Sequence, residues 1–250
     1  MLTPQDFERY ERQMLYEGFG EEGQKRLKQA HVLIAGAGGL GCPAATYLAC
    51  AGIGHITLVD HETVSLSNLN RQILHWDDNI GEKKVTSAAA KLARLNPSTT
   101  VVPIAASITD SNAEHIIRDA DVVVDATDSF DARYVLNEAC MSAGIPLVHG
   151  GIWGLCGQVT TILPRRTPCF ACIYPNKPEE YQGPPPVFGV TPGLIAIIQC
   201  AEVIKILAGF GRLLAGQMLY VNESNMDFCL RELQANPDCK VCGGRKELIR

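Results

Sequence analysis

A glycine-rich turn between a short apolar run and a helix constrains the fold of this chain more than any other feature. The apolar run covers residues 31–35, and it opens directly into Gly36-Ala37-Gly38-Gly39-Leu40-Gly41. This is the spacing G-x-G-x-x-G, in which a tight turn, a close approach of phosphate and helix–strand packing each need a glycine. Asp60 ends the next expected strand and can bind ribose hydroxyls. The turn therefore predicts nucleotide binding, with a glycine-rich turn that binds nothing as the structural alternative.

Apolar strands and amphipathic helices alternate from residue 31 to about 150. The expected strands are 32–35, 56–59, 100–104, 121–125 and 146–149. The expected helices are 7–30 at the start of the chain and then 40–51, 82–95, 110–117 and 130–143. This alternation is typical of an α/β fold with right-handed crossovers. We expect a Rossmann-like, mostly parallel sheet with helices on both faces.

The pattern changes after Gly150. An antiparallel strand is expected at 157–163 and a helix at about 193–208, followed by strands near 218–222 and 226–232. The sequence contains no internal repeat. We therefore expect one domain over 1–250, in which residues 1–150 bind nucleotide. Residues 151–250 would form a C-terminal antiparallel subregion that faces the substrate and carries two C-x-x-C pairs, a spacing typical of zinc ligands.

Composition excludes several classes of function. Hydrophobic residues make up 46% of the chain and charged residues 20%, which indicates a globular protein. A net charge of −5 without a long basic run argues against a nucleic-acid partner. The longest apolar stretch, 193–201, is too short to span a bilayer, and the N-terminus does not resemble a signal peptide. With ten cysteines and no secretion signal, we expect a cytoplasmic protein whose cysteines have metal or catalytic roles.

The polar residues behind the glycine turn indicate which chemistry the nucleotide undergoes. A nicotinamide dehydrogenase has no need of Arg71, Lys84 and Asp128, whereas an enzyme that cuts ATP between its α- and β-phosphates does. Arg71 and Lys84 can neutralise phosphate charge, and Asp128 can hold magnesium at the end of a strand. Asn68 and Asn70 can bind phosphate or ribose without adding negative charge. Each residue alone has a plain alternative, such as a solvated surface charge or, for Asp128, a helix cap.

Taken together, these motifs resemble the ubiquitin-activating-enzyme-like adenylyltransferases of the MoeB, ThiF and HesA type, which activate sulfur-carrier proteins and related substrates. The matching segments are residues 9–13, 36–41, 64–72, 81–85, 126–129 and both cysteine pairs described below. The resemblance implies binding of ATP and magnesium, the latter by Asp128. The expected nucleotide-binding set is Gly36, Gly38, Gly39, Gly41, Asp60, Ser67, Asn68, Leu69, Asn70, Arg71, Lys84, Asp128 and Ser129. Ser129 departs from the family, in which asparagine is usual.

The resemblance also implies a homodimer. In the family, the arginine that matches Arg12 reaches the ATP phosphates of the partner subunit. The expected catalytic residues are therefore Arg71, Lys84, Asp128 and, in trans, Arg12.

Two C-x-x-C pairs suggest a metal site. The pairs are Cys169 with Cys172 and Cys239 with Cys242, and four thiolates at this spacing are typical of structural zinc. A redox C-x-x-C is the alternative interpretation. The remaining cysteines have mostly apolar neighbours in the sequence and are expected to be packing residues: Cys42, Cys50, Cys140, Cys156, Cys200 and Cys229.

The loop before the last long helix contains no cysteine, although many relatives form a covalent bond to their carrier protein there. The segment 181–193 contains three consecutive prolines instead. We therefore expect an enzyme that stops at the acyl-adenylate. The leading hypothesis is adenylation of the C-terminal glycine of a ubiquitin-like sulfur carrier, and the alternative is adenylation of a small-molecule carboxylate without a thioester. A non-catalytic nucleotide sensor or a dehydrogenase would leave Arg71, Lys84 and Asp128 unexplained.

Overall fold

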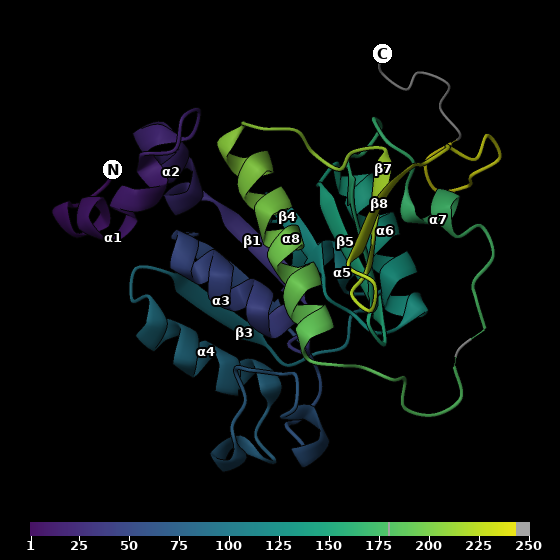
Figure 1. The fold of residues 1–250 in the computed structure, drawn as a ribbon, viewed down its shortest axis with the longest axis horizontal. Coiled ribbons are helices and arrows are strands. Elements are labelled where there is room, and N and C mark those ends of the chain that lie inside the picture. The colour runs from purple at the N-terminus through teal and green to yellow at the C-terminus, as the bar shows by residue number, and fades with distance from the viewer. Residues whose placement is uncertain (180, 244–250) are drawn as a thin grey trace.

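The computed structural model describes residues 1–179 and 181–243, and a single eight-stranded sheet runs through them (Figure 1). The strand order is β3-β2-β1-β4-β5-β6-β7-β8. Strands β1 to β5 pair in parallel, whereas β6, β7 and β8 continue the sheet as antiparallel neighbours. The strands are β1 (His31–Ala35), β2 (His55–Val59), β3 (Thr100–Ile104), β4 (Val122–Asp125), β5 (Leu147–Trp153), β6 (Cys156–Ile162), β7 (Gln217–Asn222) and β8 (Asp227–Glu232).

Helices cover both faces of the sheet. The α-helices are α1 (Pro4–Met14), α2 (Gly20–Gln29), α3 (Gly41–Ala51), α4 (Lys84–Leu95), α5 (Ala113–Ile117), α6 (Phe130–Ala143), α7 (Phe170–Ile173) and α8 (Val190–Ala208). Two short 3-10 helices, η1 (Leu66–Asn68) and η2 (Asp77–Asn79), lie in the connection between β2 and α4. Side chains of α2, α3, α4 and α8 form one buried apolar cluster, and those of α5, α6 and α7 form the other. The expected Rossmann-like sheet with an antiparallel C-terminal part is confirmed.

The expected single helix over residues 7–30 is wrong. The chain forms α1 and α2 instead, because it turns between them at Gly18 (φ +84°) and Gly20 (φ +57°). Both residues have the left-handed backbone that glycine adopts without a steric penalty.

Strand β5 and helix α5 also differ from their expected bounds. Strand β5 continues to Trp153 rather than ending at residue 149, because its pairing with β6 extends to Trp153 opposite Cys156. Helix α5 begins only at Ala113, since the side chain of Asn112 accepts a hydrogen bond from the Thr109 backbone N–H and forms a turn there.

Helix α8 is longer than the apolar run from which it was expected. By length and composition alone it is sufficient to cross a membrane. It nevertheless lies along the sheet (Figure 1), with Ile195, Ala196 and Val203 fully buried in the apolar cluster that also holds α3. This packing is that of the core helix of a globular domain.

The strand order determines where a ligand site can form. Strand β1 lies between β2 and β4, and Ala35 is opposite Asp125 at the carboxyl ends of β1 and β4. The connections from these two strands leave the sheet in opposite directions, which opens a crevice in parallel sheets. The glycine turn after β1 and the segment 126–129 after β4 are therefore neighbours.

Candidate active site

The glycine turn is packed so closely that two of its glycines cannot be replaced. A Cβ atom on Gly36 (φ +108°) would lie 2.4 Å from the carbonyl oxygen of Ala126, and one on Gly41 would lie 1.9 Å from that of Gly36. Gly38 is different, because the nearest atom to its Cβ position is Nε2 of Gln72 at 3.6 Å. Gly36 and Gly41 thus shape the turn, and Gly38 leaves its outer side open.

Features on the open side of the turn fit a phosphate group. Helix α3 begins at Gly41 without a capping side chain. Within its first turn the Cys42 N–H donates to the Gly38 carbonyl (3.0 Å) and Pro43 has no N–H, so the N–H groups that a phosphate could use are those of the glycine turn itself. The side chain of Gln72 is buried beside Gly38, and its Oε1 has no hydrogen-bond partner among the described residues. A buried polar atom without a partner is costly, and a bound ligand can supply one.

Asp60 contacts the turn directly, and Glu62 links Lys84 to Asp60. The carboxylate of Asp60 accepts hydrogen bonds from the backbone N–H of Ala37 (2.8 Å) and of Glu62 (2.8 Å). Lys84 Nζ forms an ion pair with Glu62, although the lysine side chain is 3% exposed and the glutamate 50%. The hydrogen bond from Lys84 outweighs partial burial and lowers the pKa of Glu62. The ammonium group is therefore held near the turn by a carboxylate that faces solvent.

The segment 67–71 covers the end of η1 and the turn that follows it. The Arg71 guanidinium donates to the backbone carbonyl of Ser67 (2.8 Å) and to Oδ1 of Asn70 (2.8 Å). Asn68 accepts from the Ser65 backbone N–H with its own side chain (3.1 Å). A Cβ on Gly39 would lie 3.6 Å from Cδ of Arg71, so the arginine is adjacent to the glycine turn.

Asp128 and Ser129 follow β4 at the same edge of the sheet. Asp128 is exposed and has no hydrogen-bond or ion-pair partner in the part of the chain that the structure describes. The cap of α6 is Ser129, whose Oγ accepts from the Ala132 N–H (3.2 Å). Ser129 therefore performs the capping role that was the alternative interpretation of Asp128, and the Asp128 carboxylate is free to bind a ligand.

Arg12 lies away from the other candidate residues. It is exposed on α1, without a hydrogen-bond or ion-pair partner in ranges 1–179 and 181–243. Its neighbours on that helix, Arg9 and Gln13, donate to the carbonyls of Leu95 and Ala51, at the C-terminal ends of α4 and α3. The glycine turn is at the opposite end of α3, which is about 16 Å long at 1.5 Å per residue.

The segment before α8 lies against the candidate nucleotide residues. A Cβ on Gly189 would lie 2.5 Å from the carbonyl oxygen of Asn70, and one on Gly39 would lie 3.3 Å from Pro192. The Gly154 N–H donates to the carbonyl of Pro186 (3.0 Å), and Thr191 donates to that of Gly154 (2.9 Å). This segment therefore connects the glycine turn with the end of β5.

The four expected metal ligands come together. The Sγ atoms of Cys169, Cys172, Cys239 and Cys242 all lie within 4.8 Å of one another. The separations are 3.9 Å for Cys169–Cys172, 3.6 Å for Cys169–Cys239 and 3.3 Å for Cys172–Cys242. Tetrahedral zinc with bonds of about 2.3 Å requires sulfur separations of about 3.8 Å, so the cluster fits zinc. Although burial opposes ionisation of Cys239, the backbone N–H groups of Cys242 and Val241 outweigh it and lower the pKa of this thiol to about 7.

The expectation that all other cysteines are packing residues is wrong in part. Cys42, Cys140 and Cys200 are buried, and burial raises the pKa of each. Cys50 and Cys156 are exposed, and Cys229 is half-buried. Apolar neighbours in the sequence misled the prediction for Cys156, because this residue begins a strand at the rim of the sheet.

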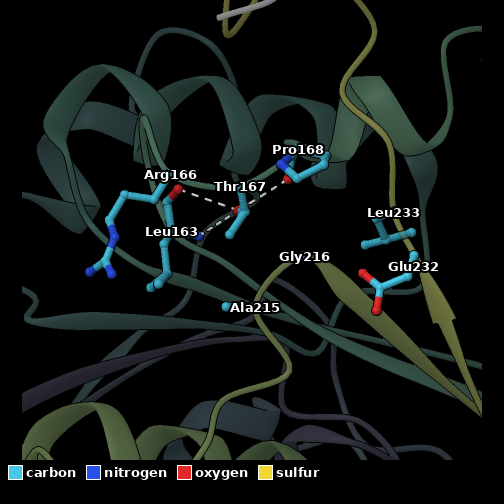
Figure 2. A pocket seen from close by; sticks show the side chains of 8 residues that line it. All are labelled: Leu163, Arg166, Thr167, Pro168, Ala215, Gly216, Glu232 and Leu233. Atoms are coloured by element: carbon cyan, nitrogen blue, oxygen red, sulfur yellow. Dashed lines mark hydrogen bonds between the residues drawn. The ribbon is translucent and has the colours of Figure 1, made fainter. Parts of the chain in front are cut away.

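A hollow of about 320 Å³ lies at the other edge of the sheet (Figure 2). The turn after β6 and the ends of β7 and β8 line it, with Leu163, Thr167, Gly216 and Leu233 among the lining residues. Because β6 ends where β5 begins, this hollow is opposite the carboxyl edge that carries the glycine turn. It belongs to neither the nucleotide residues nor the cysteine cluster.

Sequence reasoning missed several residues that support these groups. Glu62 holds Lys84, Gln72 faces Gly38, and Asp125 accepts from the Thr127 N–H (3.0 Å). His75 lies behind the turn, with Nε2 3.0 Å from the Ala37 carbonyl, and burial lowers its pKa so that the ring is neutral. The only signal for Asp125 was its position at the end of an apolar strand.

Fold and geometry define a Rossmann-like protein with a glycine turn at its topological switch point and a four-cysteine cluster. Residues 10–241 match the model of the ThiF family, and the chain belongs to that family. It is 43% identical to the SAMP-activating enzyme E1 of Haloferax volcanii, over 97% of this chain and 91% of that protein. It is 39% identical to the sulfur carrier protein adenylyltransferase of Thermus thermophilus, over 99% and 96%. Among solved structures, E. coli MccB with AMPCPP and MccA has a TM-score of 0.85 at 27% identity, covering 94% of this chain and 74% of that one.

Proposed function

We propose that this ThiF-family protein activates a carboxylate as an acyl-adenylate at the crevice between β1 and β4. It is an ATP-dependent adenylyltransferase, and its substrate is the C-terminal glycine of a ubiquitin-like sulfur-carrier protein. The observation that carries this proposal is the gathering of the glycine turn, Arg71, Lys84 and the unpartnered Asp128 at one edge of the sheet. The relatives named above as activating or adenylyltransferase enzymes support it.

The proposed reaction brings two anions together, so the protein must neutralise charge. The acyl carboxylate attacks the α-phosphorus of ATP, and the bond to the bridging oxygen of the diphosphate breaks. Arg71 and Lys84 would bind phosphate oxygens, and Asp60 would bind the ribose. Magnesium, when bound by Asp128, offsets the charge of the phosphates. The N–H groups of the glycine turn would hold the phosphates in line for attack.

A second substrate class is supported by the solved structures. MccB, whose structure is similar to 94% of this chain, was crystallised with MccA. This chain also has no cysteine in the segment 181–193, where a covalent carrier intermediate would form. A small carboxylate or peptide is therefore the alternative substrate, used without a thioester.

Exchange of labelled pyrophosphate into ATP tests the reaction, because adenylation is reversible until the acyl group leaves. With magnesium present, we expect exchange only when a sulfur-carrier protein ending in glycine is added. The same carrier lacking its terminal glycine is the matched control and should give none. Exchange with a small acid or peptide but not with any carrier would favour the alternative, and nicotinamide binding without exchange for any acyl substrate would contradict the whole proposal.

We also propose a homodimer in which Arg12 acts on the partner's nucleotide. The position of Arg12 on α1 supports this, because α1 contacts the C-terminal end of α3 whereas the glycine turn lies at the N-terminal end of that helix. We propose that residues 1–250 act as one unit, with 1–150 for the nucleotide and 151–250 for substrate and zinc. A cytoplasmic location agrees with four thiols that must stay reduced, and no nucleic-acid or membrane partner is proposed.

We propose that the cysteine cluster binds one zinc ion and stabilises the C-terminal segment. A four-thiolate site leaves no open position for substrate, so the ion has a structural role. We expect Cys239→Ser to lower the melting temperature by several degrees, and to lower the activity of the remaining folded protein less. Metal analysis and a thermal melt measure both effects, with exposed Cys50→Ser as the control. A metal-free preparation with unchanged melting temperature would contradict the assignment.

A further inference from the structure

A line of buried polar side chains extends from β5 to the turn that carries Asp128. His149 in β5 is fully buried, and its Nδ1 lies 2.7 Å from Oδ2 of Asp125 at the end of β4. On the other side of the ring, Nε2 lies 3.3 Å from Nε2 of Gln158 in β6. The same amide nitrogen donates to the hydroxyl of Tyr174 (2.5 Å). None of these residues has a role in the proposed reaction so far.

The contacts determine where the protons are. Although burial opposes ionisation of Asp125, the hydrogen bond from His149 and the nearby guanidinium of Arg133 keep its pKa below the usual value. The carboxylate therefore accepts a hydrogen bond from His149 Nδ1–H, and His149 Nε2 accepts one from the amide of Gln158. Burial lowers the pKa of His149, which agrees with a neutral ring. Each hydrogen bond in the line thus has one donor and one acceptor.

The second oxygen of Asp125 holds the turn itself. Asp125 Oδ1 accepts from the Thr127 N–H (3.0 Å) and the Thr127 hydroxyl (2.7 Å). The Thr127 carbonyl accepts from Nη2 of Arg133 (2.8 Å), and the Asp125 carbonyl accepts from Gln199 (2.8 Å). The residue next to Thr127 is Asp128. The carboxylate and carbonyl of Asp125 and the N–H, hydroxyl and carbonyl of Thr127 are therefore all hydrogen-bonded, and Asp128 follows directly after them.

The histidine ring cannot rotate away from Asp125. The ring of Phe170 packs edge-on against it, with centroids 5.0 Å apart, and Phe170 is itself buried. The Phe170 N–H donates to Oδ1 of Asn137 in α6 (2.9 Å), which fixes the phenylalanine. Since both sides of the ring are held, His149 can fix Asp125 rather than follow it.

We propose that His149 is a positioning residue for magnesium binding: through Asp125 it holds the turn 125–128 so that the Asp128 carboxylate is presented to the magnesium of the nucleotide. This inference rests on the proposed role of Asp128. Groups that hydrogen-bond to metal-site elements from behind change metal affinity about 10- to 100-fold when removed. Its effect therefore belongs to magnesium binding rather than to the rate at saturation.

The test compares His149→Leu, which has no donor, with His149→Asn, whose amide can still donate to Asp125. In pyrophosphate exchange, we expect His149→Leu to raise the magnesium concentration for half-maximal rate about tenfold, with the rate largely restored at saturation. His149→Asn should stay within about twofold of the unmodified protein. Thr127→Val removes a bond to Asp125 from the less buried side. It should act like His149→Leu without touching the core, which keeps the test valid if His149→Leu does not fold.

Amide hydrogen exchange of the ligand-free protein gives a second readout that does not depend on activity. We expect faster exchange at residues 127–128 in His149→Leu and Thr127→Val, and unchanged exchange in His149→Asn. An unchanged magnesium requirement together with unchanged exchange at these amides would overturn the inference. Asp128→Ala distinguishes failure of the proposed function from failure of this inference. If Asp128→Ala leaves magnesium binding intact, the proposed role of Asp128 fails. If Asp128→Ala impairs magnesium binding but His149→Leu and Thr127→Val do not, only the inference about His149 is overturned.

Discussion

Lys84 is a buried cation whose partner carboxylate faces solvent. Its side chain is 3% exposed and that of Glu62 50%, so the ammonium group cannot leave the site while Glu62 can move. The pKa of Glu62 is lowered by Lys84, so the carboxylate remains ionised at neutral pH and this pairing is lost only as the pH falls through that lowered pKa. In the proposed reaction, a phosphate oxygen would replace the Glu62 carboxylate as the partner of Lys84.

We expect loss of the charged residues to stop adenylation without unfolding the protein. Asp128→Ala should abolish pyrophosphate exchange, and Arg71→Ala and Lys84→Met should each slow it at least about a hundredfold, the scale of one lost preorganised contact. Lys84→Met keeps the buried volume of the side chain. The matched control is Lys83→Ala, since Lys83 is exposed and its side chain donates to the backbone carbonyl of His61 rather than to an acidic group. Near-normal exchange rates in all three variants would exclude these roles.

At the residue scale, the sequence indicated the candidate nucleotide-binding residues but not the residues that contact and support them. Arg71, Lys84 and Asp128 are recognisable because they follow a nucleotide-type turn in a fixed order. Glu62 and His149 are not, because a charged residue in a loop and a histidine in an apolar strand have many ordinary explanations. Each contacts its partner, Lys84 for Glu62 and Asp125 for His149, across 22 and 24 positions of the sequence, and such contacts exist only in the folded chain.

At the scale of elements, the glycines of the turn after β1 differ in what surrounds them. Gly36 and Gly41 pack against backbone carbonyls, whereas the Cβ position of Gly38 is in ordinary contact distance of one flexible side chain. Three glycines with the same motif spacing therefore have different physical reasons to be there.

We expect Gly41→Ala and Gly38→Ala to fail in different ways. The new methyl group of Gly41→Ala would overlap the carbonyl oxygen of Gly36, so stability should fall by about 1–3 kcal/mol or more. Gly38→Ala should fold with nearly unchanged stability but bind ATP weakly, because its methyl group occupies the side where phosphate approaches. Thermal melts and calorimetric ATP titration distinguish the two effects. Tight ATP binding by Gly38→Ala would place the phosphates elsewhere.

Element types were predictable from periodicity, and their ends were less so. Strands β1 to β4 are apolar runs between helices, and the structure has them within one residue of the expected bounds. The break between α1 and α2 was missed because amphipathic residues continue through Gly18 and Gly20, and only the backbone conformation shows the turn. The length of β5 was missed because it depends on pairing with β6.

For the whole molecule, the position of α1 bears on the proposed homodimer. Arg12 lies on α1, which contacts the C-terminal ends of α3 and α4, so one chain does not bring Arg12 together with Arg71, Lys84 and Asp128. The mixed dimer of two inactive variants tests this arrangement.

We expect an equimolar mixture of Arg12→Ala and Asp128→Ala to recover activity after subunit exchange. In a mixed dimer, one site has an intact Asp128 and receives Arg12 from the other subunit. Half of the dimers are mixed and each has one complete site, so about a quarter of the original exchange activity should return. Each variant alone is the control. Recovery near zero, with mixed dimers confirmed by mass spectrometry, would mean that Arg12 acts within its own chain. Full activity of Arg12→Ala alone would mean that Arg12 has no role in the reaction.

The cysteine cluster also dictates the order in which the molecule can be completed. Cys169 and Cys239 are 70 positions apart. Strand β6 precedes Cys169 in the sequence, and α8, β7 and β8 lie between the two cysteines. A growing chain therefore presents the first two thiols long before the second two exist, and it can close the cluster only after its last strand has emerged. A metal ion bound by all four thiols would therefore tie the segment after β8 to the segment after β6 only in a chain that extends to Cys242.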